Sequence, residues 1–537
     1  MSPSIRASLL SHRLDYLVIG GGFSGLNAMS ALKRANPHLR AVCVDPRPGP
    51  GGSWNEFYSF VRLHNPHPMF GVDGHSWGIP EPTVLASKEQ VLHHFTSFVD
   101  GAMPAGFAYA GGVRYECLMA PALPGTGGSP APLRVSLQSE DTGEEFIVDA
   151  FRVIDARGFD YAGHMKADQD PRSDGSTRGR ELMPGDLPEL LQAGAEAAAP
   201  GAGPGRLFVV VGGGKMGIDT AGFLVDHVRA EDSIVLITGT PKWFSNRDMI
   251  VGHRKPTHSF LPTWSQLTQP TFAQMVLDMA LKWDGHNAEE VLLEQGRRGT
   301  LISVAGPGRS YAVGLLSEAE KARVEQHCRV VVDDHFRGAD FATRAGLTST
   351  VRLQSGESID TTKELVIVNC RTSGAHRATA FTRPDAHPLR PDGRIEGSST
   401  FGLTGVTSFL LGSLVELKGQ GALERLPLFG NMRHGIGRSG YDPDHILGFL
   451  VRSFANILSA SDILGPRFMS AHTLDPNKWY HPAKQVLELG NLLTKRKALE
   501  AQCLKHCRIM EAYEPDPVAG ADGRVKASSS DQLASVA

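Results

Sequence analysis

Two glycine-rich turns, far apart in the chain, most constrain what this sequence can fold into. Gly20–Gly25 follows the apolar run Asp15–Ile19, Gly212–Gly217 follows Leu207–Val211, and a helical pattern follows each turn. In turns of this kind the first glycine permits the bend, the second lets a pyrophosphate approach, and the third lets helix and strand pack closely. The candidate cofactor-binding residues in the two turns are Gly20, Gly22, Phe23, Ser24, Gly25, Gly212, Gly214, Lys215, Met216 and Gly217.

The context of the two turns predicts an α/β fold with two Rossmann-like dinucleotide-binding domains and helical additions. One glycine turn alone is weak evidence, but a strand before and a helix after each of two turns strengthen it. A dinucleotide pyrophosphate would lie at each helix N-terminus, where unpaired N–H groups favour negative charge. The sequence therefore predicts a chain that holds two dinucleotides.

The residues that follow each turn differ in charge. About twenty residues after the first turn, Asp45 closes the strand Ala41–Asp45, where an acid accepts hydrogen bonds from ribose hydroxyls. The corresponding position after Gly217 is Ile237, with no carboxylate beside it, and Lys242 follows soon after. A cation there favours the 2′-phosphate of NADPH over NADH. The alternative is that Lys242 is an ordinary solvated loop charge.

Other readings of the same residues are weaker. Lys215 suggests a P-loop, but Val209 replaces its first glycine and Met216 its Ser/Thr. No C-x-x-C stands near the second turn, which disfavours a disulfide reductase. No metal site is expected, because the histidines at 64, 67, 75, 93 and 94 lack a ligand set at regular spacing and are typical of loop and surface positions.

Composition narrows the class of protein. At 537 residues the chain has room for two or three domains, and its net charge of -3 gives no reason to bind nucleic acid. Six irregularly spaced cysteines favour a reducing compartment, so a cytoplasmic location is expected. No transmembrane segment is expected, because Ile446–Leu464 is interrupted by polar residues and suits an amphipathic helix. The oligomeric state is not readable from the sequence.

The order of these patterns divides the chain. We expect a first dinucleotide-binding part at 1–165, a second at 206–375 with a helical insertion near 241–345, a return to the first domain with C-terminal helices at 376–513, and a disordered tail at 514–537.

The stretch after Asp45 resembles a known family. Gly51-Gly52-Ser53-Trp54 and Arg62-Leu63-His64-Asn65-Pro66 are similar to motifs of the two-dinucleotide FAD/NADPH flavoprotein monooxygenases, the class B, flavin-containing monooxygenase-like enzymes. The resemblance implies FAD at the first turn, with Gly52, Ser53 and Trp54 beside it, and NADPH at the second. It also implies that Asn65 lies at the reactive edge of the flavin, with His64 and Arg62 lining the same pocket.

The activity implied is monooxygenation of a small organic substrate by molecular oxygen, at nitrogen, sulfur or carbon, through a peroxyflavin. Two alternatives stay open at this point. One is an NAD(P)H-dependent flavin reductase or an FAD oxidase on the same scaffold, and the other is a non-catalytic flavin-binding module.

Overall fold

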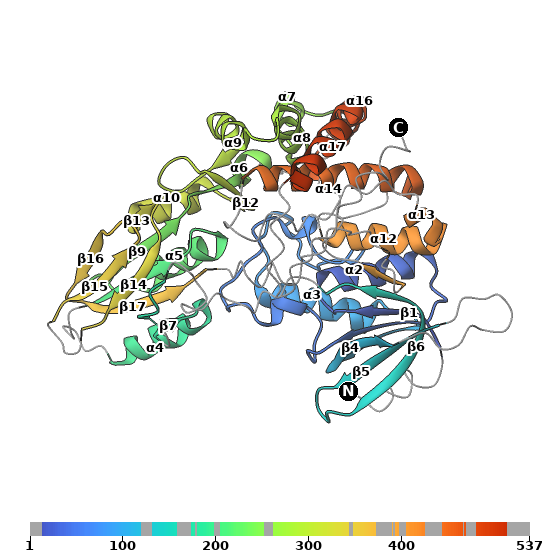
Figure 1. The fold of residues 1–537 in the computed structure, drawn as a ribbon, viewed down its shortest axis with the longest axis horizontal. Helices are drawn as coiled ribbons and strands as arrows, with labels where there is room; N and C mark the ends of the chain where they lie inside the picture. The colour runs from blue at the N-terminus through green and yellow to red at the C-terminus, as the bar shows by residue number, and fades with distance from the viewer. Residues whose placement is uncertain are drawn as a thin grey trace, which may run out of the picture.

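The structure of the chain is a computed structural model, and two separate sheets, one mixed and one parallel, form its framework together with a layer of helices (Figure 1). The expected tail at 514–537 lies outside the described residues. The described residues are 13–119, 132–157, 173–177, 180–197, 205–251, 261–342, 347–371, 389, 393–396, 404–424, 443–465, 467–468 and 479–512.

The first sheet contains the first glycine turn. Its order is β3-β2-β1-β6-β5-β4, in which β3, β2, β1 and β6 are parallel, β5 and β4 are antiparallel, and β18 adds to β6. A strand from late in the chain thus pairs with the first sheet. The strands are β1 (Leu14–Ile19), β2 (Ala41–Asp45), β3 (Phe107–Gly111), β4 (Val113–Met119), β5 (Leu133–Ser139), β6 (Glu145–Asp155) and β18 (Arg394–Glu396).

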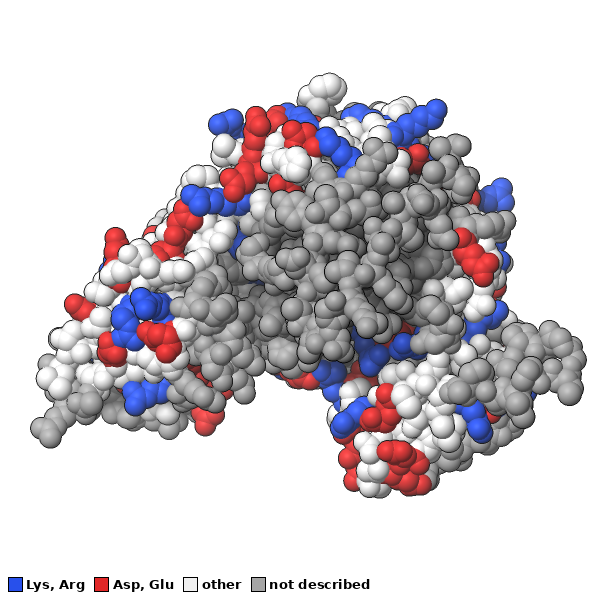
Figure 2. Space-filling view, in the orientation of Figure 1, with Lys and Arg blue, Asp and Glu red and all other residues white. Residues whose placement is uncertain are grey.

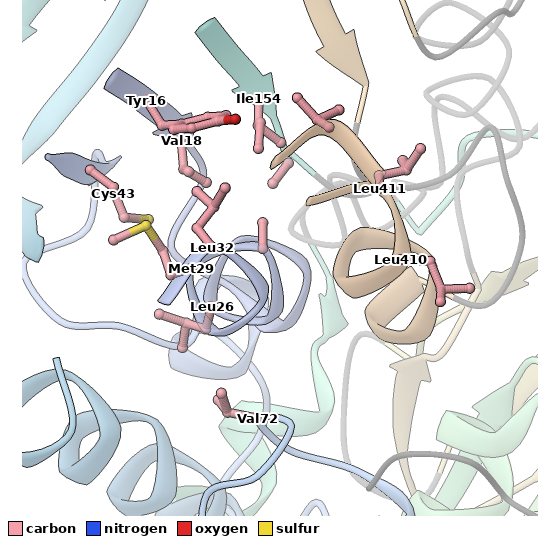
Figure 3. Close-up of a cluster of buried hydrophobic side chains, with 14 of the residues drawn as sticks. Tyr16, Val18, Leu26, Met29, Leu32, Cys43, Val72, Ile154, Leu410 and Leu411 are labelled. Atoms are coloured by element: carbon pink, nitrogen blue, oxygen red, sulfur yellow. The ribbon is translucent and has the colours of Figure 1, made fainter. Parts of the chain in front are cut away.

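Helices α2 (Phe23–Ala35) and α12 (Thr404–Lys418) pack together against this sheet. Figure 3 shows Met29 and Leu32 of α2 close to Cys43 and Val18 of the strands, with α12, which carries Leu411, beside α2, and all of these residues are buried. The close approach of the two helices needs a glycine, because a Cβ at Gly412 would lie 3.0 Å from the Cβ of Ala31. Helix α3 (Lys88–Gly101) covers the same layer and begins with a Ser87/Gln90 capping box.

The second sheet contains the second glycine turn and is wholly parallel, in the order β13-β9-β8-β17-β7. Residues 329–332 lie within the segment expected to be a helical insertion, yet they form β13, because the β-branched run Val330–Val332 suits a strand. The strands are β7 (Glu181–Leu182), β8 (Arg206–Val211), β9 (Ser233–Gly239), β13 (Arg329–Val332) and β17 (Glu364–Asn369), with the helices α4 (Leu187–Ala197), α5 (Lys215–His227) and α10 (Glu318–His327).

Two small sheets complete this half of the molecule. Sheet β11-β10-β12 follows β9 in the chain, and sheet β14-β15-β16 packs on the second parallel sheet. The 241–345 segment is therefore a mixture of strands and helices. The small-sheet strands are β10 (Lys242–Asn246), β11 (Leu301–Ile302), β12 (Ser310–Leu316), β14 (Phe336–Asp340), β15 (Ser349–Leu353) and β16 (Ser358–Thr361).

A separate helical layer packs around the buried side chain of Trp283. Its longest helix, α14, contains the one stretch in the described residues that is long and apolar enough to cross a membrane, but most of that stretch is buried against the other helices. A helix forms at 446–464 as expected, but its described residues other than Asp462 are buried or half-buried, so it is a core helix rather than one with an exposed polar face. The helices outside the two parallel units are α6 (Arg247–Ile250), α7 (Trp264–Thr268), α8 (Phe272–Lys282), α9 (Ala288–Arg297), α13 (Gln420–Glu424), α14 (Pro443–Leu464), α16 (Pro482–Thr494) and α17 (Arg496–Ala512).

Candidate cofactor sites

The first glycine turn has the backbone geometry of an anion site. Gly20 has φ +104° and donates its N–H to the carbonyl of Val44 at 2.8 Å, which fixes the bend between β1 and α2. A Cβ at Gly25 would overlap the carbonyl oxygen of Gly20, so only glycine allows the helix to begin here. Helix α2 starts after Gly22 with no side-chain cap and no acid in its first turn. Its first N–H groups are therefore available to a phosphate.

The second turn repeats this geometry almost atom for atom. Gly212 has φ +131° and donates its N–H to the carbonyl of Ile237 at 2.9 Å. A Cβ at Gly217 would overlap the carbonyl oxygen of Gly212, whereas a Cβ at Gly214 would meet nothing within 4 Å. Helix α5 also begins with no side-chain cap. Both turns fit a pyrophosphate.

The strand tips beside the turns differ, as the sequence suggests. The N–H groups of Gly21 and Arg47 donate to the two oxygens of the buried Asp45 carboxylate at 2.7 and 2.9 Å. The register of β9 places Thr238, one residue beyond the expected Ile237, at the equivalent position. Its hydroxyl donates to the carbonyl of Val331 at 3.1 Å, so a neutral side chain occupies the position that Asp45 has in the first unit.

The Gly-Gly-Ser-Trp segment lies against the first turn. Gly52 has φ +55°, and a Cβ on it would lie 2.9 Å from the Cα of Gly22, so two bare backbones meet at the start of α2. Such a cradle is what a close pyrophosphate requires. The remaining predicted residues of this unit lie around it: Ser53 and Trp54 in a single helical turn (Gly52–Asn55), Ser24 buried in α2, and Phe23 stacked on Phe70 with ring centroids 4.2 Å apart.

The chain between Tyr58 and Asn65 connects the two units. Phe60 stacks on Phe223 of α5 with ring centroids 3.9 Å apart, and the Tyr58 hydroxyl donates to Asp219 at 3.2 Å. Nδ1 of His64 accepts the N–H of Leu315 at 3.2 Å. The segment that carries Asn65 is thus held against the second unit. The sequence analysis did not foresee this, because none of these partners lies near the segment in sequence.

Lys215 belongs to a half-buried charge network rather than presenting its ammonium at the turn. The ammonium pairs with Asp219 and with Glu320, at 3.3 Å for the second, and Arg247 pairs with Glu320 at 2.5 Å and donates to the carbonyl of His64 at 3.1 Å. Lys215 was predicted to bind the cofactor. The geometry supports a contribution from its backbone N–H at the start of α5, because its ammonium is engaged in the ion pairs. Met216 beside it packs into the core of the second unit.

The network shifts the pKa values of its members. Burial opposes the charge on Lys215, but Asp219 and Glu320 outweigh it and raise the pKa of Lys215. Burial also opposes the charge on Glu320, yet Lys215 and Arg247 lower its pKa to about 2. Burial, together with Lys215 and Arg247, lowers the pKa of His64 to about 4. His64 is therefore neutral at pH 7, with Nδ1 as the acceptor.

The other predicted site residues are Arg62, Asn65 and Lys242, and the hydrogen bonds and strand pairing that place them are made outside the glycine turns. Arg62 is exposed, and its guanidinium donates to the carbonyl of Leu85 at 3.3 Å. The Asn65 amide donates to the carbonyl of Pro66 at 3.3 Å and is half-buried. Lys242 is the first residue of β10, shortly after the tip of β9, where its backbone is paired with β12.

In each sheet the strand that follows the glycine-turn strand on the side away from β2 or β9 ends in the same kind of motif, which the sequence analysis did not select; these strands are β6 and β17. At the end of β6, Asp155 accepts the backbone and side-chain N–H groups of Arg157, and at the end of β17, Asn369 accepts those of Arg371. The guanidinium of Arg371 is buried and makes a two-pronged pair with Glu181 at 2.6 and 2.7 Å. The sequence signal for this motif is the same at both strand ends: an acid or an amide is followed two residues later by an arginine.

The histidines correct one expectation. Surface or loop exposure was expected, but His67 is 3% and His94 is 1% exposed, and the His94 ring stacks on Trp77 with centroids 4.0 Å apart. Nε2 of His94 accepts the N–H of Val72 at 2.9 Å. Within the described residues no group of His, Cys, Asp and Glu is arranged to hold a metal ion. These rings are core side chains.

No protein-family model matches the chain. An uncharacterised protein of Mycobacterium tuberculosis is 26% identical over 255 residues, which are 43% of this chain and 40% of that protein. A probable FAD-binding monooxygenase of Acinetobacter baylyi is 27% identical over 92 residues, 17% of this chain and 18% of that protein. The chain thus spans less than half the length of these relatives. Among solved structures, the FAD-bound cadaverine monooxygenase of Erwinia amylovora covers 76% of this chain and 95% of its own, at 12% identity and a TM-score of 0.43.

Proposed function

We propose that the chain is an FAD-dependent oxidoreductase that NADPH reduces, and that it acts as a monooxygenase on a small organic substrate. One observation carries the proposal: two anion-binding turns with the same backbone geometry have different strand tips, Asp45 in the first unit and Thr238 in the second. A carboxylate suits the ribose of FAD, and its absence suits a 2′-phosphate. The short match to a probable FAD-binding monooxygenase agrees with this assignment.

The residues of the chain would divide the work as follows. The N–H groups at the start of α2 and α5 bind the two pyrophosphates, and Gly22 with Gly52 gives the first one room. Lys242 is our candidate for the 2′-phosphate. Bound FAD would supply the redox chemistry, accepting a hydride from NADPH and passing electrons to oxygen. Asn65 would offer a neutral amide at the reacting edge, in a segment that Phe60 and His64 hold against the second unit.

The first experiment tests for the two cofactors. The purified protein should absorb near the flavin maximum, and NADPH added without oxygen should bleach it faster than NADH does. A flavin that binds but is not bleached by either nucleotide would leave a non-catalytic flavin module. A protein that binds no flavin even after reconstitution with FAD would refute the proposal altogether.

A second experiment separates monooxygenase from reductase and oxidase activity. NADPH and oxygen consumption are followed with a panel of amines, sulfides and ketones, and hydrogen peroxide is measured at the same time. A monooxygenase yields oxygenated product and little peroxide with its substrate, whereas stoichiometric peroxide with every compound identifies an oxidase. Asn65→Ser should lower the ratio of product to peroxide and leave the rate of anaerobic reduction unchanged. Equal ratios in both proteins would remove Asn65 from its role.

A further inference from the structure

Helix α16 buries its charged side chains and exposes its apolar ones, which is the reverse of a typical surface helix in a soluble protein. Its charged side chains, Lys484 and Glu488, face inward, where they are 4% and 5% exposed and pair at 2.9 Å. The Lys484 ammonium also donates to the carbonyl of Leu267 at the end of α7, at 2.8 Å. An inward charge pair of this kind leaves the apolar residues of the helix on the outside.

The outer faces of α16 and α7 together expose large apolar side chains. Figure 1 shows the two helices side by side at the top of the molecule. A surface with several strongly exposed large apolar side chains in one place marks an interaction site in a soluble protein. We call this surface the apical patch; its residues are Trp264 (80% exposed), Val486 (71%), Leu487 (57%), Leu489 (52%) and Leu493 (51%).

The exposed sequence neighbours of the apical patch are uncharged or basic. No charged residue occurs between Leu261 and Leu277, and the charged residues of α16 are the buried pair already described. Immediately after α16, Lys495 and Lys497 are exposed. Figure 2 shows uncharged side chains projecting at the top of the molecule, with both basic and acidic side chains around them. The nearby acids of α8 and α9, Asp278 and Glu294, are paired with basic side chains.

We propose that the apical patch docks the protein on an anionic phospholipid surface. An indole and several leucines on a short helical edge, bordered by lysines, are the composition that inserts shallowly among headgroups and acyl chains. The lysines complement anionic headgroups, since basic residues near a membrane gain from its negative surface potential. A stable dimer needs a flatter and larger surface, about 20 to 30 residues a side. This inference does not rest on the proposed oxidoreductase activity.

The test is co-sedimentation of the full-length protein with vesicles of phosphatidylglycerol and phosphatidylcholine, compared with vesicles of phosphatidylcholine alone. The wild type should bind the anionic vesicles, less well as salt rises. Trp264→Ser/Leu487→Ser/Leu489→Ser should lower partitioning by about tenfold or more, because burial of apolar groups supplies much of the affinity. The matched control Ile147→Ser/Leu347→Ser, which changes exposed apolar residues elsewhere, should bind as the wild type does.

Two further measurements keep the outcome independent of folding defects. Lys495→Glu/Lys497→Glu leaves the apolar residues in place and should remove the preference for anionic vesicles. Vesicles should shift the tryptophan emission of the wild type to shorter wavelength, and Trp264→Phe should abolish that shift. A wild type that sediments with neither vesicle refutes the proposal. A wild-type dimer that the triple substitution converts to a monomer, seen by light scattering, would assign the apical patch to a second copy instead.

Discussion

Three glycines of helix α5 provide a sharp test of the second cofactor site, because each meets a different environment. A Cβ at Gly214 would meet nothing within 4 Å, a Cβ at Gly217 would overlap the carbonyl oxygen of Gly212, and a Cβ at Gly222 would also meet nothing within 4 Å. Gly214 is the N-cap, with φ −80° and ψ −179°, a conformation that alanine adopts without strain. The alanine variants at 214, 217 and 222 should therefore separate binding from stability.

Gly214→Ala should weaken NADPH and leave the fold nearly intact. Replacing an N-cap glycine with alanine costs a few tenths of a kcal/mol to about 1 kcal/mol of stability. The added methyl projects where the pyrophosphate would approach, and loss of one hydrogen bond to a charged group costs about 1.5–3 kcal/mol. At about 1.4 kcal/mol per factor of ten, this predicts roughly a ten- to hundredfold rise in the dissociation constant for NADPH.

The two companion variants give the opposite patterns. Gly217→Ala should lower stability by about 1–3 kcal/mol or more, because the start of α5 must move away from β8 to relieve the overlap. Gly222→Ala, in the middle of the same helix, should raise stability by about 0.5–1 kcal/mol and leave binding unchanged. Thermal unfolding and titration with NADP⁺ measure both quantities for all three. A Gly214→Ala protein that binds NADP⁺ as tightly as the wild type would refute the assignment of this turn to a pyrophosphate.

Further predictions concern single side chains. Asp45→Asn should purify with roughly a tenth or less of the wild-type FAD, because a charged acceptor for the ribose is lost; equal flavin absorbance would count against it. Glu181→Gln should cost about 3–5 kcal/mol, because it removes the carboxylate that pairs with the buried guanidinium of Arg371, whereas Glu364→Gln at an exposed pair should cost under about 1 kcal/mol; denaturant unfolding distinguishes them. Below pH 6.5 the unfolded chain protonates His64, but the folded chain does so only near pH 4, so stability should fall across this window by up to about 1.4 kcal/mol per pH unit. His64→Gln should flatten that part of the pH profile of unfolding, and an unchanged profile would contradict the burial of His64.

The local geometry of both cofactor turns was predictable from sequence because it depends on steric rules that act over a few residues. Gly25 and Gly217 stand where a side chain would overlap the preceding carbonyl, and spacing alone locates them. Asp45 was found in the same way. The tip of the second unit was placed one residue early, at Ile237 instead of Thr238, because fixed spacing does not report the register of β8 and β9.

Contacts between distant segments were not predictable in this way. Nothing in the local pattern of residues 58–65 indicates that Phe60 stacks on Phe223 or that His64 meets Leu315. The burial of His94 was missed for the same reason, since the Val72 N–H that donates to its Nε2 comes from a separate loop. Helix α16 shows the limit most clearly, because periodicity locates an apolar face and tertiary packing decides whether that face points inward.

The close equivalence of the two turns has a consequence for cofactor choice. Their backbones offer a pyrophosphate the same bend, the same helix N-terminus and the same missing side chains, so neither turn by itself selects one dinucleotide over the other. Selection must come from the residues around the turns. In the first unit these are the Asp45 carboxylate and the bare backbone of Gly52, and in the second they are the neutral Thr238 and the cations that follow β9. A carboxylate introduced at Thr238 should therefore turn the preference of the second unit from NADPH toward NADH, because a fixed negative charge repels the 2′-phosphate and accepts the ribose hydroxyls instead. Thr238→Asp with an unchanged ratio of NADPH to NADH turnover would show that the discrimination lies elsewhere, in Lys242 or its neighbours.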